Sequence, residues 1–218
     1  VATDAGGVYE MKRNAAAEYV YYSVPAEFKI RTGHDGYPDF YVRLDTSQQK
    51  IRRDFTLERL AGVERSFRLI CIGDPQINEA SHAVRFKEEA GREIREYAAS
   101  AGVPCYGITL GDHVNNKWTL FTNMVVALQP EQTGVPVFAT IGNHDHEFPT
   151  ADEKAARAKY ESYFGPVDYS FNRGDVHVVS MDNVIHSCKA SADYEGGFTA
   201  AQYAWLKHCL LYTSDAAD

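Results

Sequence analysis

The sequence predicts an α/β protein in which a small β-rich segment precedes a region of alternating strands and helices. Residues 1–65 contain only short strand-like runs separated by turn residues, whereas from Ser66 onward apolar runs alternate with amphipathic, helix-like stretches. With 218 residues, 44% of them hydrophobic and 24% charged, the chain can bury a sizeable core. No apolar run approaches the ~20 residues that a membrane helix requires. We therefore predict a partial β-sandwich over 1–65 and an α/β domain over 66–208.

The front segment has the alternating pattern of antiparallel strands. Four runs show it, at residues 8–11, 19–24, 40–44 and 51–57. The turn at Thr3 to Gly7 and the Val24-Pro25-Ala26 strand ending resemble the transthyretin-like or carboxypeptidase-regulatory-like sandwiches that precede some bacterial surface enzymes. This resemblance implies a small sandwich whose first strands are missing, and a periplasmic or other extracytoplasmic, envelope-attached location.

From Ser66 the expected elements alternate. They are a strand at 67–73, a helix at 80–101 that ends at Gly102, a strand at 103–110, a helix at 117–129, a strand at 135–141, a helix at 151–164, a strand at 175–181 and a helix at 199–208 capped by Thr199. Such alternation predicts a sheet covered on both faces, with the loops after the carboxyl ends of the strands available for chemistry.

The last ten residues, Cys209–Asp218, correspond residue by residue to the translation of a common transposase sequencing adapter. We treat 209–218 as a translated artefact and expect the natural sequence to stop near His208. Cysteines then remain at positions 71, 105 and 188, and those at 71 and 105 lie in apolar runs where thiols are usually buried. These cysteines predict no disulfide framework.

The charge of the chain limits its possible partners. It has 22 Lys plus Arg against 30 Asp plus Glu, a formal net charge of −8. This balance argues against a broad basic surface that binds nucleic acid, so nucleic acid is expected only as a possible substrate. The net charge does not exclude a local phosphate or metal site.

Polar residues follow a glycine at the end of each central strand. The three motifs are Gly73-Asp74-Pro75-Gln76, Gly111-Asp112-His113 and Gly142-Asn143-His144-Asp145. A glycine after an apolar strand lets the chain turn sharply and brings a short polar side chain to the carboxyl edge of the sheet. Carboxylate, amide and imidazole groups are ligands for divalent cations. Each motif alone is more often a turn or a helix cap, but three after successive strands favour a metal site.

These motifs resemble the calcineurin-like metallophosphoesterase superfamily, whose pattern is Asp-x-His, Gly-Asp, Gly-Asn-His-Asp/Glu and two later His motifs. The resemblance covers residues 66–208. The string 111–116 and the closing Gly-Gly-Phe-Thr-x-x-Gln-x-x-Trp-Leu at 196–206 are similar to the bacterial branch that carries a sandwich domain in front. The resemblance implies a layered αββα core, incomplete in this chain, and a phosphoric-ester hydrolase that uses two divalent metal ions (Mn, Fe, Zn or Mg).

The resemblance also implies roles for six residues. Asp74 and Gln76 hold the first metal, Asp112 bridges the two metals, Asn143 holds the second, His144 donates a proton or contacts phosphate, and Asp145 orients His144. A bridging carboxylate offsets the repulsion between the cations, and the pair lowers the pKa of a shared water so that hydroxide can attack phosphorus. An imidazole on the far side can protonate the leaving alkoxide.

Two departures from the superfamily pattern matter. Gln76 stands where the superfamily has His, and an amide oxygen is a harder ligand, which favours Mn²⁺ or Mg²⁺. The two later His motifs are absent from the sequence. We therefore expect this fragment to be inactive, and we expect the parent protein to be an active phosphoesterase. The alternative is a non-catalytic surface or binding module that retains the fold. Monoester, diester, nucleotide and phospholipid-headgroup substrates all remain open.

The other histidines are expected to have structural or surface roles. His113 and His146 are loop residues for which hydrogen bonding is the commoner role, and no ligand-like spacing singles out the histidines at 34, 82, 177 and 186.

Overall fold

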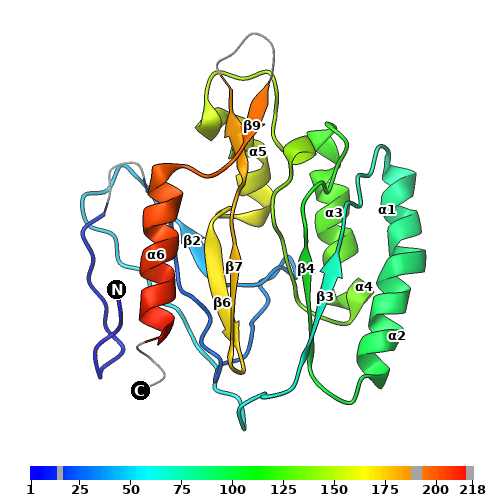
Figure 1. The fold of residues 1–218 in the computed structure, drawn as a ribbon. Helices are drawn as coiled ribbons and strands as arrows, with labels where there is room; N and C mark the ends of the chain where they lie inside the picture. The colour runs from blue at the N-terminus through cyan, green and yellow to red at the C-terminus, as the bar shows by residue number, and fades with distance from the viewer. Residues whose placement is uncertain (14–16, 188–192, 215–218) are drawn as a thin grey trace.

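The computed structural model describes residues 1–13, 17–187 and 193–214 (Figure 1). Its strands are β1 (Tyr19–Tyr21), β2 (Tyr41–Arg43), β3 (Arg68–Ile72), β4 (Cys105–Thr109), β5 (Val137–Phe138), β6 (Tyr169–Arg173), β7 (Val176–Ser180), β8 (Val184–His186) and β9 (Tyr194–Gly196). Its α-helices are α1 (Ala80–Phe86), α2 (Arg92–Ser100), α3 (Phe121–Leu128), α4 (Pro130–Thr133), α5 (Glu153–Phe164) and α6 (Ala200–Ser214). A π-helical turn, η1 (Lys87–Gly91), joins α1 to α2, and η2 (Trp118–Leu120) and η3 (Asn143–Asp145) are 3₁₀ turns. The α/β class is confirmed.

The central sheet has the order β3-β4-β5 with all strands parallel. Every residue of β4 is buried, as expected for the middle strand of a covered parallel sheet. The third strand is shorter than the predicted 135–141. After Phe138, the main-chain N–H of Ala139 donates to the Tyr37 hydroxyl and that of Thr140 to the Thr109 hydroxyl, so these groups are not available to continue the pairing with β4.

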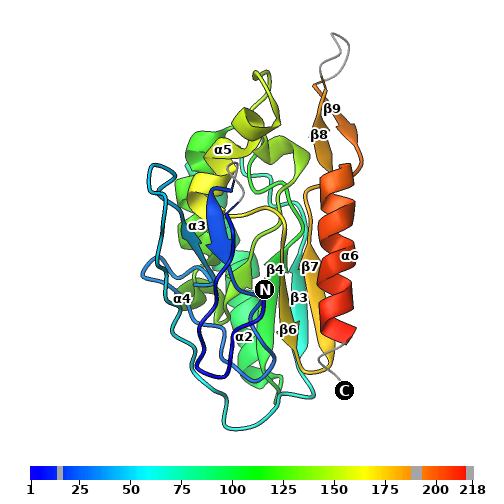
Figure 2. The same ribbon diagram turned by 90° about the vertical axis from the view of Figure 1, so that its left-hand side faces the viewer.

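Helices lie on both faces of the strands. In Figure 2 the strands β3, β4, β6 and β7 are seen nearly edge on, with α3 and α5 on one side and α6 on the other. The last helix continues to Ser214, beyond the predicted end at His208, because residues 209–214 contain no Gly or Pro to stop it. Gln202 and Thr199 form reciprocal capping hydrogen bonds at its start, as predicted.

The described front residues, 1–13 and 17–65, do not form the predicted sandwich. β1 and β2 pair there, antiparallel, isolated antiparallel bridges join Phe28 to Arg59 and Thr32 to Pro38, and the runs at 8–11 and 51–57 are not strands. The reason is that the apolar side chains of this segment pack on the α/β core in place of a second sheet. Phe40 contacts the rings of Phe138 and Tyr169, and Val24 forms a parallel bridge with Phe171 of β6. The front segment is thus part of the main core.

Two further expectations concern the burial of the cysteines and the absence of a membrane-spanning helix. Cys105 is buried as expected, whereas Cys71, on the edge strand β3, is exposed. Cys188 lies outside the described residues. Within the described ranges, no helix combines the length and the apolar character needed to cross a bilayer.

Candidate metal centre

Two glycines allow the loops after β4 and β5 to touch. Gly111 has a φ of 103°, in the region that favours glycine, and a Cβ on it would lie 2.8 Å from the Cα of Gly142. A Cβ on Gly142 would lie 2.2 Å from Oδ1 of Asp112. A side chain at either position would push the two loops apart. The glycines of the second and third motifs therefore set the distance between Asp112 and the η3 turn.

Replacing Gly142 by Ala is expected to lower the free energy of unfolding by about 1–3 kcal/mol, because the new methyl group must displace Asp112. Chemical denaturation of the purified variant measures this loss. Gly73→Ala is the matched control, since a Cβ there meets no atom within 4 Å. Equal stability of the two variants would contradict the close approach.

Asp112 joins all three loops. Its Oδ1 accepts a hydrogen bond from the main-chain N–H of His144 at 3.0 Å, and its Oδ2 accepts one from the Gln76 side-chain amide at 2.9 Å. The Gln76 main-chain N–H also donates to the Asp112 carbonyl at 2.7 Å. The Asp112 residue is 6% exposed. A nearly buried carboxylate thus lies where the loops after β3, β4 and β5 meet.

The chemistry of this donor set fits a divalent cation. Among the described residues, the only side-chain donor on the Asp112 carboxylate is the neutral Gln76 amide, which supplies no positive charge to a nearly buried anion. A half-turn of that amide replaces its nitrogen with its oxygen, and Gln76 and Asp112 then present two oxygen ligands to the same point. Oxygen ligands suit Mn²⁺ and Mg²⁺.

The backbone of these loops is strained. Among the described residues, four non-glycine residues have positive φ: Asp74 (39°), Gln76 (38°), Asp112 (52°) and Asn116 (55°). All four lie on the loops that follow β3 and β4. Such conformations cost of order 1–3 kcal/mol each and cluster at functional sites.

Asp74 and Asn143 are less firmly placed by contacts. Asp74 is exposed and lies on the same loop as Gln76. Asn143 opens η3 and lines a small hollow beside His144. This pocket, about 310 Å³ in volume, is lined by Asn116, Asn143, His144, Phe148, Asp193 and Tyr194. The structure therefore brings Gln76, Asp112 and the Asn143–His144 turn together, whereas Asp74 lies two residues before Gln76 on the same loop with an exposed side chain.

The ring of His144 is held by a residue that the motifs did not single out. Nδ1 of His144 lies 3.1 Å from the side-chain oxygen of Asn116. With the Asn116 oxygen as the acceptor, Nδ1 carries the hydrogen of this bond, and Nε2 is the other ring nitrogen. The sequence signal for Asn116 was its place at the end of the string 111–116, which is similar to the bacterial branch, but no role was predicted for it.

Asp145 contacts His113 and not the ring of His144, which corrects the expected orienting role. Its Oδ2 lies 2.9 Å from Nδ1 of His113 and 3.0 Å from the Gly142 N–H, and its Oδ1 accepts the N–H groups of His113 and Val114 at 2.8 and 3.2 Å. The 3₁₀ turn directs this carboxylate inward, where it is fully buried. Asp145 therefore acts as a structural link between the loops after β4 and β5.

A second group of possible metal ligands begins at the residue directly after the η3 turn. His146, Glu153 and Asp182, called the His146 triad below, each offer one ligand atom within 4.8 Å of the other two. His146 and Asp182 are buried, and Glu153 is partly exposed. Sequence reasoning missed this group. Asp182 follows β7 as Asp112 follows β4, and that repeated strand-then-Asp pattern was the available signal.

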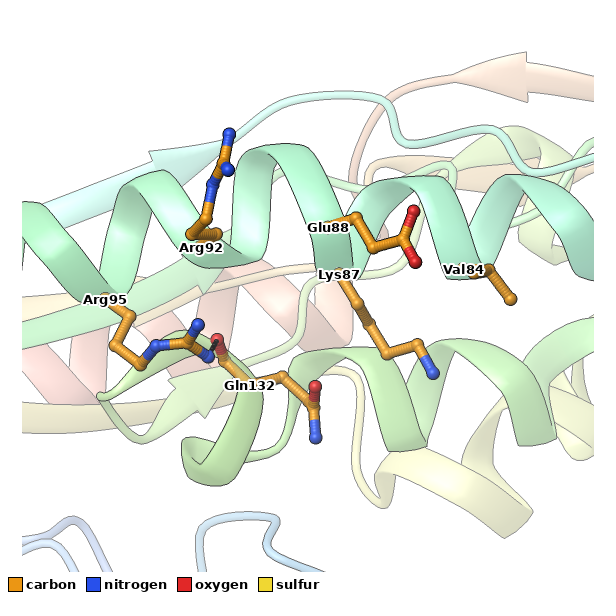
Figure 3. A pocket seen from close by; sticks show the side chains of 6 residues that line it. All are labelled: Val84, Lys87, Glu88, Arg92, Arg95 and Gln132. Atoms are coloured by element: carbon orange, nitrogen blue, oxygen red, sulfur yellow. Dashed lines mark hydrogen bonds between the residues drawn. The ribbon is translucent and has the colours of Figure 1, made fainter.

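A larger hollow lies away from these loops. It has a volume of about 580 Å³ and is lined by Val84, Lys87, Glu88, Arg92, Arg95 and Gln132, on the α1–η1–α2 helix and α4 (Figure 3). Arg95 donates to the main-chain oxygen of Gln132 at 2.8 Å, which ties the helices together. None of the predicted site residues lines it, so we regard it as a crevice between packed helices.

Comparison with known families now adds an independent observation. Residues 1–60 match the family described as "N terminal of Calcineurin-like phosphoesterase". The match supports the calcineurin-like phosphoesterase superfamily, which the strand-end motifs of residues 66–208 had indicated separately. A comparison with curated proteins finds no match. Calcineurin-like phosphoesterases are generally metal-dependent hydrolases, and the front segment is the part of this chain that carries the match.

Proposed function

We propose that the protein is a metal-dependent phosphoric-ester hydrolase whose site lies at the carboxyl ends of β3, β4 and β5. The observation that carries this proposal is the Asp112 carboxylate, nearly buried and hydrogen-bonded to both neighbouring loops. The family match of residues 1–60 supports it independently. Asp74, Gln76, Asp112 and Asn143 would hold two divalent cations, with Asp112 between them. When bound, such cations stabilise charge on phosphoryl oxygens and lower the pKa of water.

The chain's own residues have distinct tasks in this proposal. Asn116 fixes the ring of His144 through Nδ1, so Nε2 is the nitrogen that transfers a proton. His144 in its protonated form donates that proton to the departing alkoxide oxygen, which would otherwise leave as a poor, charged group. Asp145 and Gly142 hold the turn that carries His144 in place.

Replacing His144 by Ala in the complete gene product, loaded with Mn²⁺, is expected to lower kcat by about 10²–10⁴-fold. The loss should be larger for an alkyl phosphate than for p-nitrophenyl phosphate, because nitrophenolate needs no proton to leave. His82→Ala is the matched control, since His82 is exposed and pairs with Glu79 at 3.2 Å. An equal loss of kcat for both substrates would contradict the proton-donor role. An unchanged kcat for both would show that His144 has no part in catalysis.

The location and the branch of the superfamily rest on sequence resemblances. We propose a protein of the bacterial branch, supported by the similarity of residues 111–116 and 196–206 to that branch, and an extracytoplasmic location, supported by the sequence of the front segment although not by its fold. A complete gene product that carries all four predicted ligands but neither retains metal nor hydrolyses phosphate esters would favour the alternative, a binding module that keeps the fold.

A further inference from the structure

Both ring nitrogens of His146 lie within hydrogen-bond distance of an oxygen acceptor. Its Nδ1 lies 2.9 Å from the main-chain oxygen of Gly142, and its Nε2 lies 3.1 Å from Oδ2 of Asp182. Both of these oxygens are acceptors, and a neutral imidazole has one N–H. With that N–H donated to Gly142, the Nε2 lone pair points at a carboxylate. In that tautomer, either an added proton on Nε2 or a metal ion bound to it would lie between Nε2 and Asp182.

The two carboxylates of the His146 triad are already oriented as metal ligands are. Oδ1 of Asp182 accepts the Val184 N–H at 3.0 Å, and Oε2 of Glu153 accepts the His186 N–H at 2.6 Å. Metal-bound histidines usually donate their other N–H to a backbone carbonyl, and ligating carboxylates are usually hydrogen-bonded in turn. All three members of the triad have such a supporting hydrogen bond.

The surroundings of the triad are strongly acidic. Oδ1 of Asp168 accepts the main-chain N–H of Asp182 at 2.9 Å, and Glu161 lies on the same helix as Glu153. Arg157 is the cation that faces the group, and it lies closer to Glu161, at 2.9 Å, than to Glu153, at 4.0 Å. The carboxylates of the triad therefore have little positive charge beside them among the described residues apart from Arg157.

We propose that His146, Glu153 and Asp182 form a third cation site, separate from the two-metal site, that binds a divalent ion of the Zn²⁺ class. With a neutral imidazole, Asp182 and Glu153 contribute two negative charges. Arg157 lies 4.0 Å from Glu153 and is shared with Glu161 at 2.9 Å, so a divalent ion offsets the two carboxylates more completely than a single proton does. One nitrogen and two oxygen ligands are a set that Zn²⁺ accepts, with room for a water. An imidazole ligand favours Zn²⁺ over Mg²⁺, whereas the Asp74, Gln76, Asp112 and Asn143 set offers oxygen only.

This ion would link three parts of the fold. His146 follows η3 directly and holds the carbonyl of Gly142, Glu153 begins α5, and Asp182 follows β7. Through His146, the ion would thus stabilise the η3 turn that carries Asn143 and His144. Because Glu153 is partly exposed, the ion can enter from solvent on that side. Binding there requires no phosphoesterase activity.

Thermal unfolding of the 218-residue chain, first stripped of metal with a chelator, tests this site. Zn²⁺ at about 100 times its dissociation constant is expected to raise the unfolding midpoint by about 5–10 °C, and the same concentration of Mg²⁺ should raise it far less. Glu153→Gln should weaken Zn²⁺ binding by about tenfold or more, since its amide oxygen can still accept the His186 N–H while its charge is lost. Glu147→Gln, a neighbour outside the triad, should behave as the wild type.

Asp112→Asn separates the two sites. The Zn²⁺ response should persist in this variant, because Asp112 belongs to the other site. The proposal fails if the wild type shows no Zn²⁺ response, if Glu153→Gln retains the full response, or if Asp112→Asn abolishes it. Far-UV circular dichroism of the metal-free Glu153→Gln variant shows whether it is folded, and Co²⁺ absorption at the site, present in wild type and absent in Glu153→Gln, gives a second readout.

Discussion

Replacing Asp112 by Asn is expected to abolish metal retention at the strand ends and to lower phosphate-ester hydrolysis in the complete gene product by about a hundredfold or more. The carboxylate supplies the charge at the meeting point of the three loops. The side-chain oxygen that remains after the substitution can still accept the His144 N–H, and the Gln76 amide can turn to face the new amide. The variant should therefore fold while losing the cations.

Elemental analysis after dialysis against Mn²⁺, together with kcat for a chromogenic phosphate ester, measures both losses. Asp175→Asn is the matched control, because Asp175 is exposed in the turn between β6 and β7. Undiminished metal content in Asp112→Asn would show that the cations are held elsewhere.

Replacing Asp145 by Asn is expected to reduce the free energy of unfolding by about 3–5 kcal/mol. The buried carboxylate accepts three main-chain N–H groups and the ring of His113. An amide nitrogen in place of either oxygen would face an N–H donor that it cannot accept. The interaction is structural, so the loss should appear in stability whether or not metal is present.

Urea denaturation of metal-free protein measures this change. Asp152→Asn provides the comparison: Asp152 caps α5 through the Ala155 N–H at 2.9 Å, and Asn caps a helix as well as Asp does. Asp152→Asn should therefore change the stability little. If Asp145→Asn were equally mild, its hydrogen bonds would contribute much less than their burial indicates.

The parallel strands and their polar ends could be predicted because they depend on local patterns. An apolar run followed by Gly and Asp specifies a strand, a sharp turn and a polar side chain at one sheet edge, and β3 and β4 end in this way. Gly111 takes the positive φ that the predicted sharp turn requires, whereas its close approach to Gly142 is visible only in the structure.

The front segment and the partner of Asp145 could not be predicted in the same way. An alternating aromatic pattern is the same whether Phe40 packs on a second sheet or, as here, on Phe138 and Tyr169 of the main core. Likewise, the Asn-His-Asp motif does not say which way a 3₁₀ turn points its last side chain, and Asp145 contacts His113. The His146 triad joins residues far apart in the sequence, which only the tertiary structure brings together.

The most direct test of the metal centre is an anomalous diffraction map from crystals of this protein grown with Mn²⁺. We predict a peak within coordination distance of the Asp112 carboxylate, with the Gln76 side-chain oxygen turned toward it. Mn²⁺ peaks only at other positions, with the Gln76 amide nitrogen still donating to Asp112, would contradict a metal centre at the ends of these strands.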